Sequence, residues 1–234
     1  MTRTLRLLTF LLLLASGSLL AEPARDLGGT WRFRLDPDDA GVAQKWFNRR
    51  LPKTIRLPGS LQEQGYGNDI TADTEWIGRT GVNRTEYPDW FTHPMYEEYR
   101  EPGSIRFPYW LQPEKHYVGP AWYQRELRIP DEWAQKRVTL TLERCHWETR
   151  VWVDGRFAGS NDSLAAPHVY DLTDHLSPGA HRLTVRVDNS LIHPVGINAH
   201  SVSNQTQTAW NGIVGDIRLS ATALAWIKDI QVFP

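Results

Sequence analysis

The residues best suited to direct chemistry lie in a polar stretch, residues 193–211, near the carboxyl end of the chain. Six of its side chains supply amides, a hydroxyl, an imidazole and an indole: His200, Asn204, Gln205, Thr206, Trp210 and Asn211. Amides and hydroxyls donate and accept hydrogen bonds, as a polyol requires, and an indole can stack on the apolar face of a pyranose. We predict that these side chains line the rim of a sugar site. The alternative is a solvated loop whose polar groups bond to their own backbone.

A second candidate region is the segment 60–118, which is rich in glycine, proline, charge and aromatic residues. Its aromatic candidates for sugar contact are Trp76, Trp90, Tyr96 and Trp110. So long a loop in a compact domain is usually either functional or disordered, and its aromatic content argues against disorder. We predict an ordered excursion across one end of the domain. The alternative is that the segment only covers a sheet edge.

Acid–base catalysis has little support in this sequence. A retaining glycosidase needs two carboxyl groups about 5 to 5.5 Å apart, and nothing in the spacing of Glu97, Glu98, Glu143 and Glu148 pairs them. Glu143 and Glu148 flank a short aromatic stretch, where salt bridges or solvated strand positions are the favoured interpretation. We therefore assign no catalytic residue to this chain.

Metal, cofactor and thiol chemistry also lack a pattern. The single cysteine, Cys145, sits among strand-forming residues and is expected to be a small buried side chain. His168, His175 and His181 lie in separate contexts, without the clustered spacing of zinc ligands. We expect neither a metal nor a cofactor.

The amino terminus is typical of an export signal. Arg3 and Arg6 precede an apolar run, small residues follow, and Ala21 is a plausible last residue before cleavage. We expect residues 1–21 to be a cleavable signal peptide and the protein to be secreted or periplasmic. No cysteine follows the apolar run to carry a lipid anchor, and no apolar run is long enough for a comfortable membrane span. The net charge of −1 gives no electrostatic reason to expect nucleic acid.

Alternating apolar and polar residues predict an all-β fold. Such alternation occurs around 31–35, 123–129, 138–142, 151–153, 183–187 and 217–219, and a further short strand is expected around 227–232. Asp154-Gly155 predicts a hairpin turn with positive φ. Turns recur about every ten residues from position 120, which is the spacing of a sandwich or jelly roll. Only Asp39–Phe47 has a pattern that could form a short helix.

Six short motifs, in order along the chain, carry a family resemblance. They are Leu27-Gly28-Gly29-Thr30-Trp31, Leu57-Pro58-Gly59-Ser60, Trp122-Tyr123-Gln124-Arg125, Val151-Trp152-Val153-Asp154-Gly155, Val185-Arg186-Val187-Asp188-Asn189 and Asn211-Gly212-Ile213. Each is weak by itself, but their combined order and spacing resemble the amino-terminal sugar-binding domain of glycoside hydrolase family 2, which includes β-galactosidases and β-glucuronidases.

The resemblance implies a jelly-roll β-sandwich of the galactose-binding type over residues 22–222, with the segment 60–118 as an aromatic-rich insertion. Residues 223–234 would then begin a linker and the next, immunoglobulin-like domain. In the family a catalytic barrel follows, with an Asn-Glu pair that this chain lacks. A loop before the equivalent of Gly212 contacts the terminal sugar, and many relatives have an aspartate where this chain has Thr206.

Three functions remain open at this point. The first is the sugar-binding domain, or a fragment, of an exported glycoside hydrolase, whose partners are a β-glycoside and the missing immunoglobulin-like and barrel domains. The second is a separate carbohydrate-binding module that takes a polysaccharide. The third is a structural or assembly domain without sugar contact.

Overall fold

The computed structural model describes residues 24–71, 74, 93–99, 101, 115–195, 210–226 and 231–232. Within these residues the regular elements are almost all strands. The strands are β1 (Ala24–Asp26), β2 (Gly29–Leu35), β3 (Lys53–Leu57), β4 (Gly59–Ser60), β5 (Asn68–Asp69), β6 (Lys115–His116), β7 (Pro120–Ile129), β8 (Arg137–Leu142), β9 (Glu148–Val153), β10 (Arg156–Asn161), β11 (His168–Asp171), β12 (Gly179–Asp188), β13 (Gly212–Ile213) and β14 (Ile217–Thr222).

Short 3₁₀ turns connect some of these strands. They are η1 (Trp46–Asn48), η2 (Gln62–Gln64), η4 (Pro94–Tyr99) and η5 (Asp131–Trp133). The short helix expected over Asp39–Phe47 is wrong: turns lead into η1 instead. The Asp36 carboxylate accepts the backbone N–H groups of Ala40 and Gly41, and Lys45 adopts a left-handed φ of 53°. The left-handed Lys45 interrupts the helical path, and its N–H donates to the Val42 carbonyl, three residues back, at 3.1 Å.

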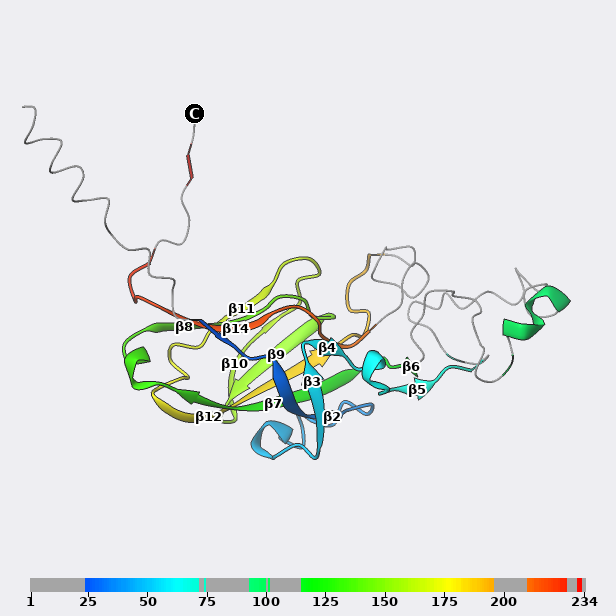
Figure 1. Cartoon of the computed structure of the whole chain (residues 1–234), viewed down its shortest axis with the longest axis horizontal. Coiled ribbons are helices and arrows are strands. Elements are labelled where there is room, and N and C mark those ends of the chain that lie inside the picture. The colour runs from blue at the N-terminus through cyan, green and yellow to red at the C-terminus, as the bar shows by residue number, and fades with distance from the viewer. Residues whose placement is uncertain are drawn as a thin grey trace, which may run out of the picture.

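Two antiparallel sheets form the body of the molecule (Figure 1). One sheet has the strand order β10-β9-β12-β7-β2-β3 and the other has the order β1-β14-β8-β11. Within the described chain, two-residue ribbons pair β4 with β13 and β5 with β6. The structure is thus the predicted jelly-roll β-sandwich. The predicted turn at Asp154-Gly155 is also confirmed, with φ values of 48° and 82°.

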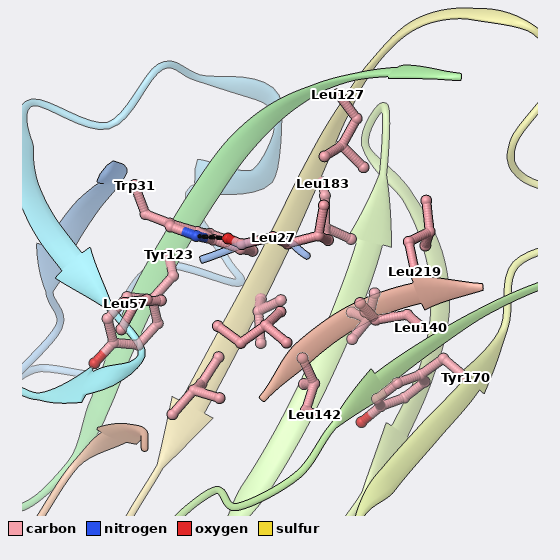
Figure 2. Packing of buried hydrophobic residues seen from close by; sticks show 14 of the residues in the cluster. Leu27, Trp31, Leu57, Tyr123, Leu127, Leu140, Leu142, Tyr170, Leu183 and Leu219 are labelled. Atoms are coloured by element: carbon pink, nitrogen blue, oxygen red, sulfur yellow. Dashed lines mark hydrogen bonds between the residues drawn. The ribbon is translucent and has the colours of Figure 1, made fainter. Parts of the chain in front are cut away.

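The core lies between the facing sides of the two sheets, as Figure 2 shows. Alternate residues of β7 and β12, such as Tyr123 and Leu183, point inward and meet Leu140 and Leu219 from the opposite sheet. These four side chains are at most 1% exposed. The period-2 alternation that predicted the strands therefore marks the inner face of each sheet.

A polar cluster is buried at one edge of this core. Thr149 of β9 contacts His168 Nδ1 at 2.6 Å and the Tyr170 hydroxyl at 2.5 Å, both from β11. His168 Nε2 lies 3.0 Å from the Ser163 carbonyl oxygen. These contacts are satisfied together when the neutral imidazole donates from Nε2 and accepts at Nδ1. Burial lowers the pKa of His168, because the charged ring would lose its hydration, and this effect exceeds the opposing hydrogen bond to Ser163.

We expect the stability contributed by this cluster to depend on pH between about 7 and 5. Because the folded-state pKa of His168 lies below the usual 6.5, the cluster contributes fully above pH 6.5. Below that pH the unfolded chain binds a proton that the folded chain resists. His168→Gln should reduce the acid-side slope of the unfolding free energy by up to ~1.4 kcal/mol per pH unit. Urea unfolding at several pH values measures this slope, and His93→Gln at an exposed site is the control. Equal slopes in the parent and His168→Gln would refute the prediction.

Candidate functional site

Both candidate loops have their described ends at the same end of the sandwich. The segment 60–118 leaves the ribbon strand β4 and returns through β6 into β7, while the polar stretch follows β12 and returns into β13. The ribbon pairs Gly212 with Ser60 and Ile213 with Gly59. It therefore places the end of the polar stretch beside the start of the aromatic segment, and β4, β5 and β6 lie together at that end in Figure 1.

Glycine is required where the ribbon strands meet. Gly212 has a φ of +142°, and a Cβ atom added there would lie 2.4 Å from the carbonyl oxygen of Gly59. Any other residue would push the two chains apart. The Asn-Gly-Ile motif that carried part of the family resemblance therefore has a physical cause in this close backbone approach.

Asn211 is the central hydrogen-bonding residue of this end. Its Oδ1 accepts the Tyr123 hydroxyl at 2.9 Å, and its Nδ2 donates to the carbonyls of Gly119 and Val187 at 2.9 and 3.1 Å. The side chain is 0% exposed. Sequence reasoning placed Asn211 on the sugar rim. In the structure its amide makes these three bonds inside the protein, so Asn211 serves as a structural anchor.

A second buried asparagine, Asn189, holds the other two loop ends. It is also 0% exposed; its Oδ1 accepts the Gly119 N–H at 2.9 Å and its Nδ2 donates to the Tyr117 carbonyl at 2.8 Å. Asn189 lies where the polar stretch begins, and Tyr117 lies where the aromatic segment ends. The two amides thus lie at three of the four ends of the candidate loops, and at the fourth the Leu61 N–H donates to the Asn211 backbone carbonyl at 2.8 Å.

A stack of three rings lies next to these amides. The His146 imidazole lies 3.7 Å from the Trp147 ring and 3.7 Å from the Trp210 ring, with interplanar angles of 24° and 17°. The Trp147 indole donates to the Asn189 carbonyl at 3.0 Å. Trp210 is half-buried, with one face covered by His146. A sugar could therefore contact only the other face or the edge of the Trp210 ring.

The stacked imidazole is neutral near pH 7. Burial lowers the pKa of His146 to about 3, although a hydrogen bond with the Trp210 backbone opposes the shift. Its Nδ1 atom is buried and has no hydrogen-bond partner. Sequence reasoning did not single out His146, because a histidine beside a strand carries no sign that two indoles will enclose it.

The remaining sequence candidates divide into two groups. Tyr96 lies within η4, but its side chain is not among those described. The other aromatic and polar candidates lie outside the described residues: Trp76, Trp90, Trp110, His200, Asn204, Gln205 and Thr206. Their contact with sugar stays a prediction, as do the signal peptide over residues 1–21 and the expected strand around 227–232, most of which is also undescribed.

The flanking carboxylates are engaged in structural contacts, as expected. Glu148 lies 3.0 Å from Arg186 and 2.9 Å from Arg150. Glu143 accepts the backbone N–H of Asp216 at 2.8 Å, which is the main reason that its pKa is lowered. Cys145 is buried and 6% exposed, and burial raises the pKa of its thiol. Among the described residues, no group of three potential ligands could hold a metal ion.

These features define the class of domain: a jelly-roll β-sandwich with the described ends of two long connections at one end. The model of the family described as "Glycosyl hydrolases family 2, sugar binding domain" matches residues 84–223. The chain therefore belongs to glycoside hydrolase family 2, through its sugar-binding domain.

The curated relatives that this chain matches are also glycoside hydrolases of these kinds. A β-glucuronidase from Paenibacillus borealis is 27% identical over 174 residues, which are 74% of this chain and 22% of that protein. A β-galactosidase from Clostridium acetobutylicum is 24% identical over 89% of this chain and 20% of its own. A β-glucuronidase from Sus scrofa is 23% identical over 95% of this chain and 33% of its own. The chain thus spans about a fifth to a third of the length of these relatives.

Solved structures share the fold. The β-glucuronidase of an uncultured Clostridium species has a TM-score of 0.57 and 22% identity, covering 88% of this chain and 30% of that one. A β-glucuronidase from Ruminococcus gnavus has a TM-score of 0.56 and 18% identity, covering 85% of this chain and 28% of that one.

Asn211→Ala should lower the free energy of unfolding by about 3 kcal/mol, because it leaves the Tyr123 hydroxyl and two buried carbonyls without partners. Asn68→Ala, at an exposed asparagine of β5, is the matched control and should change stability by less than ~0.5 kcal/mol. Urea unfolding followed by tryptophan fluorescence measures both. An Asn211→Ala variant as stable as the control would contradict the anchoring role.

Proposed function

We propose that this chain is the sugar-binding domain of an exported family 2 glycoside hydrolase, and that it helps to bind the glycoside while other domains cleave it. The family match over residues 84–223 is the observation that carries the proposal. Its named relatives are β-glucuronidases and β-galactosidases, and each is several times longer than this chain. The immunoglobulin-like and barrel domains that the resemblance implies would lie in the additional length.

The described residues would contribute positioning and not proton transfer. Asn189 and Asn211 hold the loop ends, and the ring stack braces Trp210. Fixing the ends of a loop lowers the entropy cost of ordering it around a bound polyol. Within the described residues, Glu143 and Glu148 are already committed to a backbone amide and to guanidinium groups. The described part of the chain would therefore support sugar binding through Asn189, Asn211 and the ring stack, while its two flanking glutamates would not act as acid–base groups.

The loop proposal can be tested in the longer enzyme that carries this domain. His200→Ala and Thr206→Ala should each lower kcat/KM by roughly tenfold, which corresponds to the loss of about one hydrogen bond to the bound sugar. Glu132→Ala, in η5 at the opposite end of β7, should leave kcat/KM unchanged. Nitrophenyl β-galactoside and β-glucuronide are the substrates. If kcat/KM is unaltered in both loop variants, the proposed contact of these residues with the sugar is refuted. If the 234-residue chain alone turns over a glycoside, the proposal that other domains carry out the cleavage is refuted.

We also propose that the chain is exported. The positively charged start, the apolar run and the small residues up to Ala21 support a signal peptide. Among the described residues, no helix is long and apolar enough to cross a membrane.

When expressed with its native amino terminus in a bacterium with a general secretory pathway, the chain should be recovered outside the cytoplasm beginning at Glu22. Intact-mass measurement and amino-terminal sequencing of the recovered protein establish the first residue. An Arg3→Glu, Arg6→Glu variant should accumulate uncleaved in the cytoplasm, because it reverses the charge that precedes the apolar run. A cytoplasmic parent protein that still begins at Met1 would refute export.

A further inference from the structure

The outer face of the six-stranded sheet carries a second aromatic cluster. Trp46, Leu51, Trp122 and Trp152 are each at most 5% exposed, and Phe47 packs against them. Trp122 and Trp152 point away from the core between the sheets, because they alternate with inward-facing residues of β7 and β9. The cover comes from the connection between β2 and β3, which Figure 1 shows beside β2.

Buried polar bonds hold this cover in place. The Asp36 carboxylate accepts the Trp122 indole N–H at 2.8 Å. The Gln124 amide accepts the Leu51 N–H at 3.0 Å and donates to the carbonyls of Trp46 and Arg49. The Arg34 guanidinium lies 3.6 Å from the centre of the Trp46 ring. The cover, including η1, is therefore fixed to the sheet.

Phe47 forms the aromatic wall of a surface hollow at the edge of this cover. Its ring lies parallel to that of Trp152, with a centroid distance of 5.3 Å and an interplanar angle of 7°. Phe47 is half-buried, and it borders a hollow of about 300 Å³. The stack on Trp152 fixes the orientation of the ring, so that its part in the hollow is preformed.

The other walls of the hollow are polar and mutually oriented. Arg182 donates to Glu126 at 2.9 Å. The Asp154 carboxylate accepts the Arg182 backbone N–H at 2.8 Å and contacts His181 Nδ1 at 2.6 Å. Asn48 lies over the Asp154-Gly155 turn, where a Cβ atom at position 155 would be 2.0 Å from Asn48 Oδ1. The hollow thus combines one aromatic wall with carboxylate, amide and guanidinium groups.

We propose that this hollow binds a neutral pyranose unit of an oligosaccharide, at a site separate from the two long loops. An aromatic wall suits the apolar face of a pyranose, and carboxylate and amide oxygens can accept its hydroxyl protons. A volume of about 300 Å³ is at the lower limit for small-molecule sites.

The charges of the hollow select against an acidic sugar. Glu126 and Asp154 bring two carboxylates, and the single guanidinium, that of Arg182, already pairs with Glu126. The carboxylate of a uronic acid would meet like charge without a free cation among these side chains. The site therefore takes a neutral sugar, even though several relatives are named β-glucuronidases.

The site is distant from the loop ends. The aromatic segment ends just before Pro120 of β7, and the polar stretch begins after Asp188 of β12; these two residues pair with one another. Glu126 and Arg182 form another pair on the same two strands, six residues further along, or roughly 20 Å at the usual rise of a strand. The hollow could thus hold one part of a chain-like substrate while a distant unit is processed.

The test is titration of the 234-residue chain with lactose, cellobiose and glucuronic acid, by calorimetry and by ¹H–¹⁵N spectra. We expect saturable binding of at least one neutral disaccharide with a Kd on the order of 1 mM, with the largest shifts at the Gly155 amide and the Asn48 side chain. Phe47→Ala should weaken binding at least tenfold, whereas Phe47→Tyr should retain it. Glu126→Ala should weaken binding severalfold, and it removes a side chain that is 69% exposed.

Trp226→Ala, at an exposed tryptophan outside the hollow, is the matched aromatic control and should bind the disaccharide as the parent does. Circular dichroism and thermal melting verify that each variant is folded. The proposal is overturned if neither disaccharide saturates, if Phe47→Ala and Glu126→Ala both bind like the parent, or if glucuronic acid binds more tightly than the neutral sugars. The titration needs no catalytic domain, so its outcome is independent of the kinetic test of the loop residues.

Discussion

The organisation of this domain depends on two buried amides, Asn189 and Asn211. Each lies where a regular strand gives way to a long loop, and there the backbone loses its ladder partners. A buried peptide group without a partner costs roughly 1 to 3 kcal/mol. The amides donate to the carbonyls of Tyr117, Gly119 and Val187, and Asn189 also accepts the Gly119 N–H. The sheets can therefore end, and two long connections can begin, without leaving polar groups unsatisfied in the core.

This arrangement separates stability from recognition. Side chains of the core, such as Tyr123 and Leu183, meet between the sheets and are fully buried, whereas the candidate sugar contacts lie on connections rooted at one end. Residues on such connections can change without disturbing the packing, provided that their ends stay fixed. The Gly212–Gly59 approach adds a second constraint, because the ribbon tolerates no side chain at position 212. The relatives at 23 to 27% identity share the domain despite wide divergence, as this separation allows.

Much of the fold could be predicted from alternation alone, because strands such as β7 and β12 bury one face and therefore show a period of two. The same reasoning failed where neighbours distant in sequence decide the outcome. Asp39–Phe47 has a helical pattern, but Lys45 adopts a left-handed φ of 53° there and the stretch forms turns. Asn211 has the chemistry of a sugar ligand and also that of a buried anchor, and only its contacts with Tyr123 and Gly119 distinguish the two roles. The β4–β13 ribbon is too short for any periodicity to reveal it.

The tryptophans show the same ambiguity at the level of the whole molecule. An indole serves equally in a core and on a sugar-binding face, so composition could not separate these roles. In the structure Trp31 fills the space between the sheets, while Trp122 and Trp152 lie on the outer face beneath the β2–β3 connection. That outer face is closed by side-chain bonds from Asp36 and Gln124 rather than by a third sheet. Where this cover ends, Phe47 remains half-buried: one of its faces stacks on Trp152, and the residue borders the polar hollow. The aromatic surface available to a ligand is thus set by where the covering segment stops, which no local sequence pattern records.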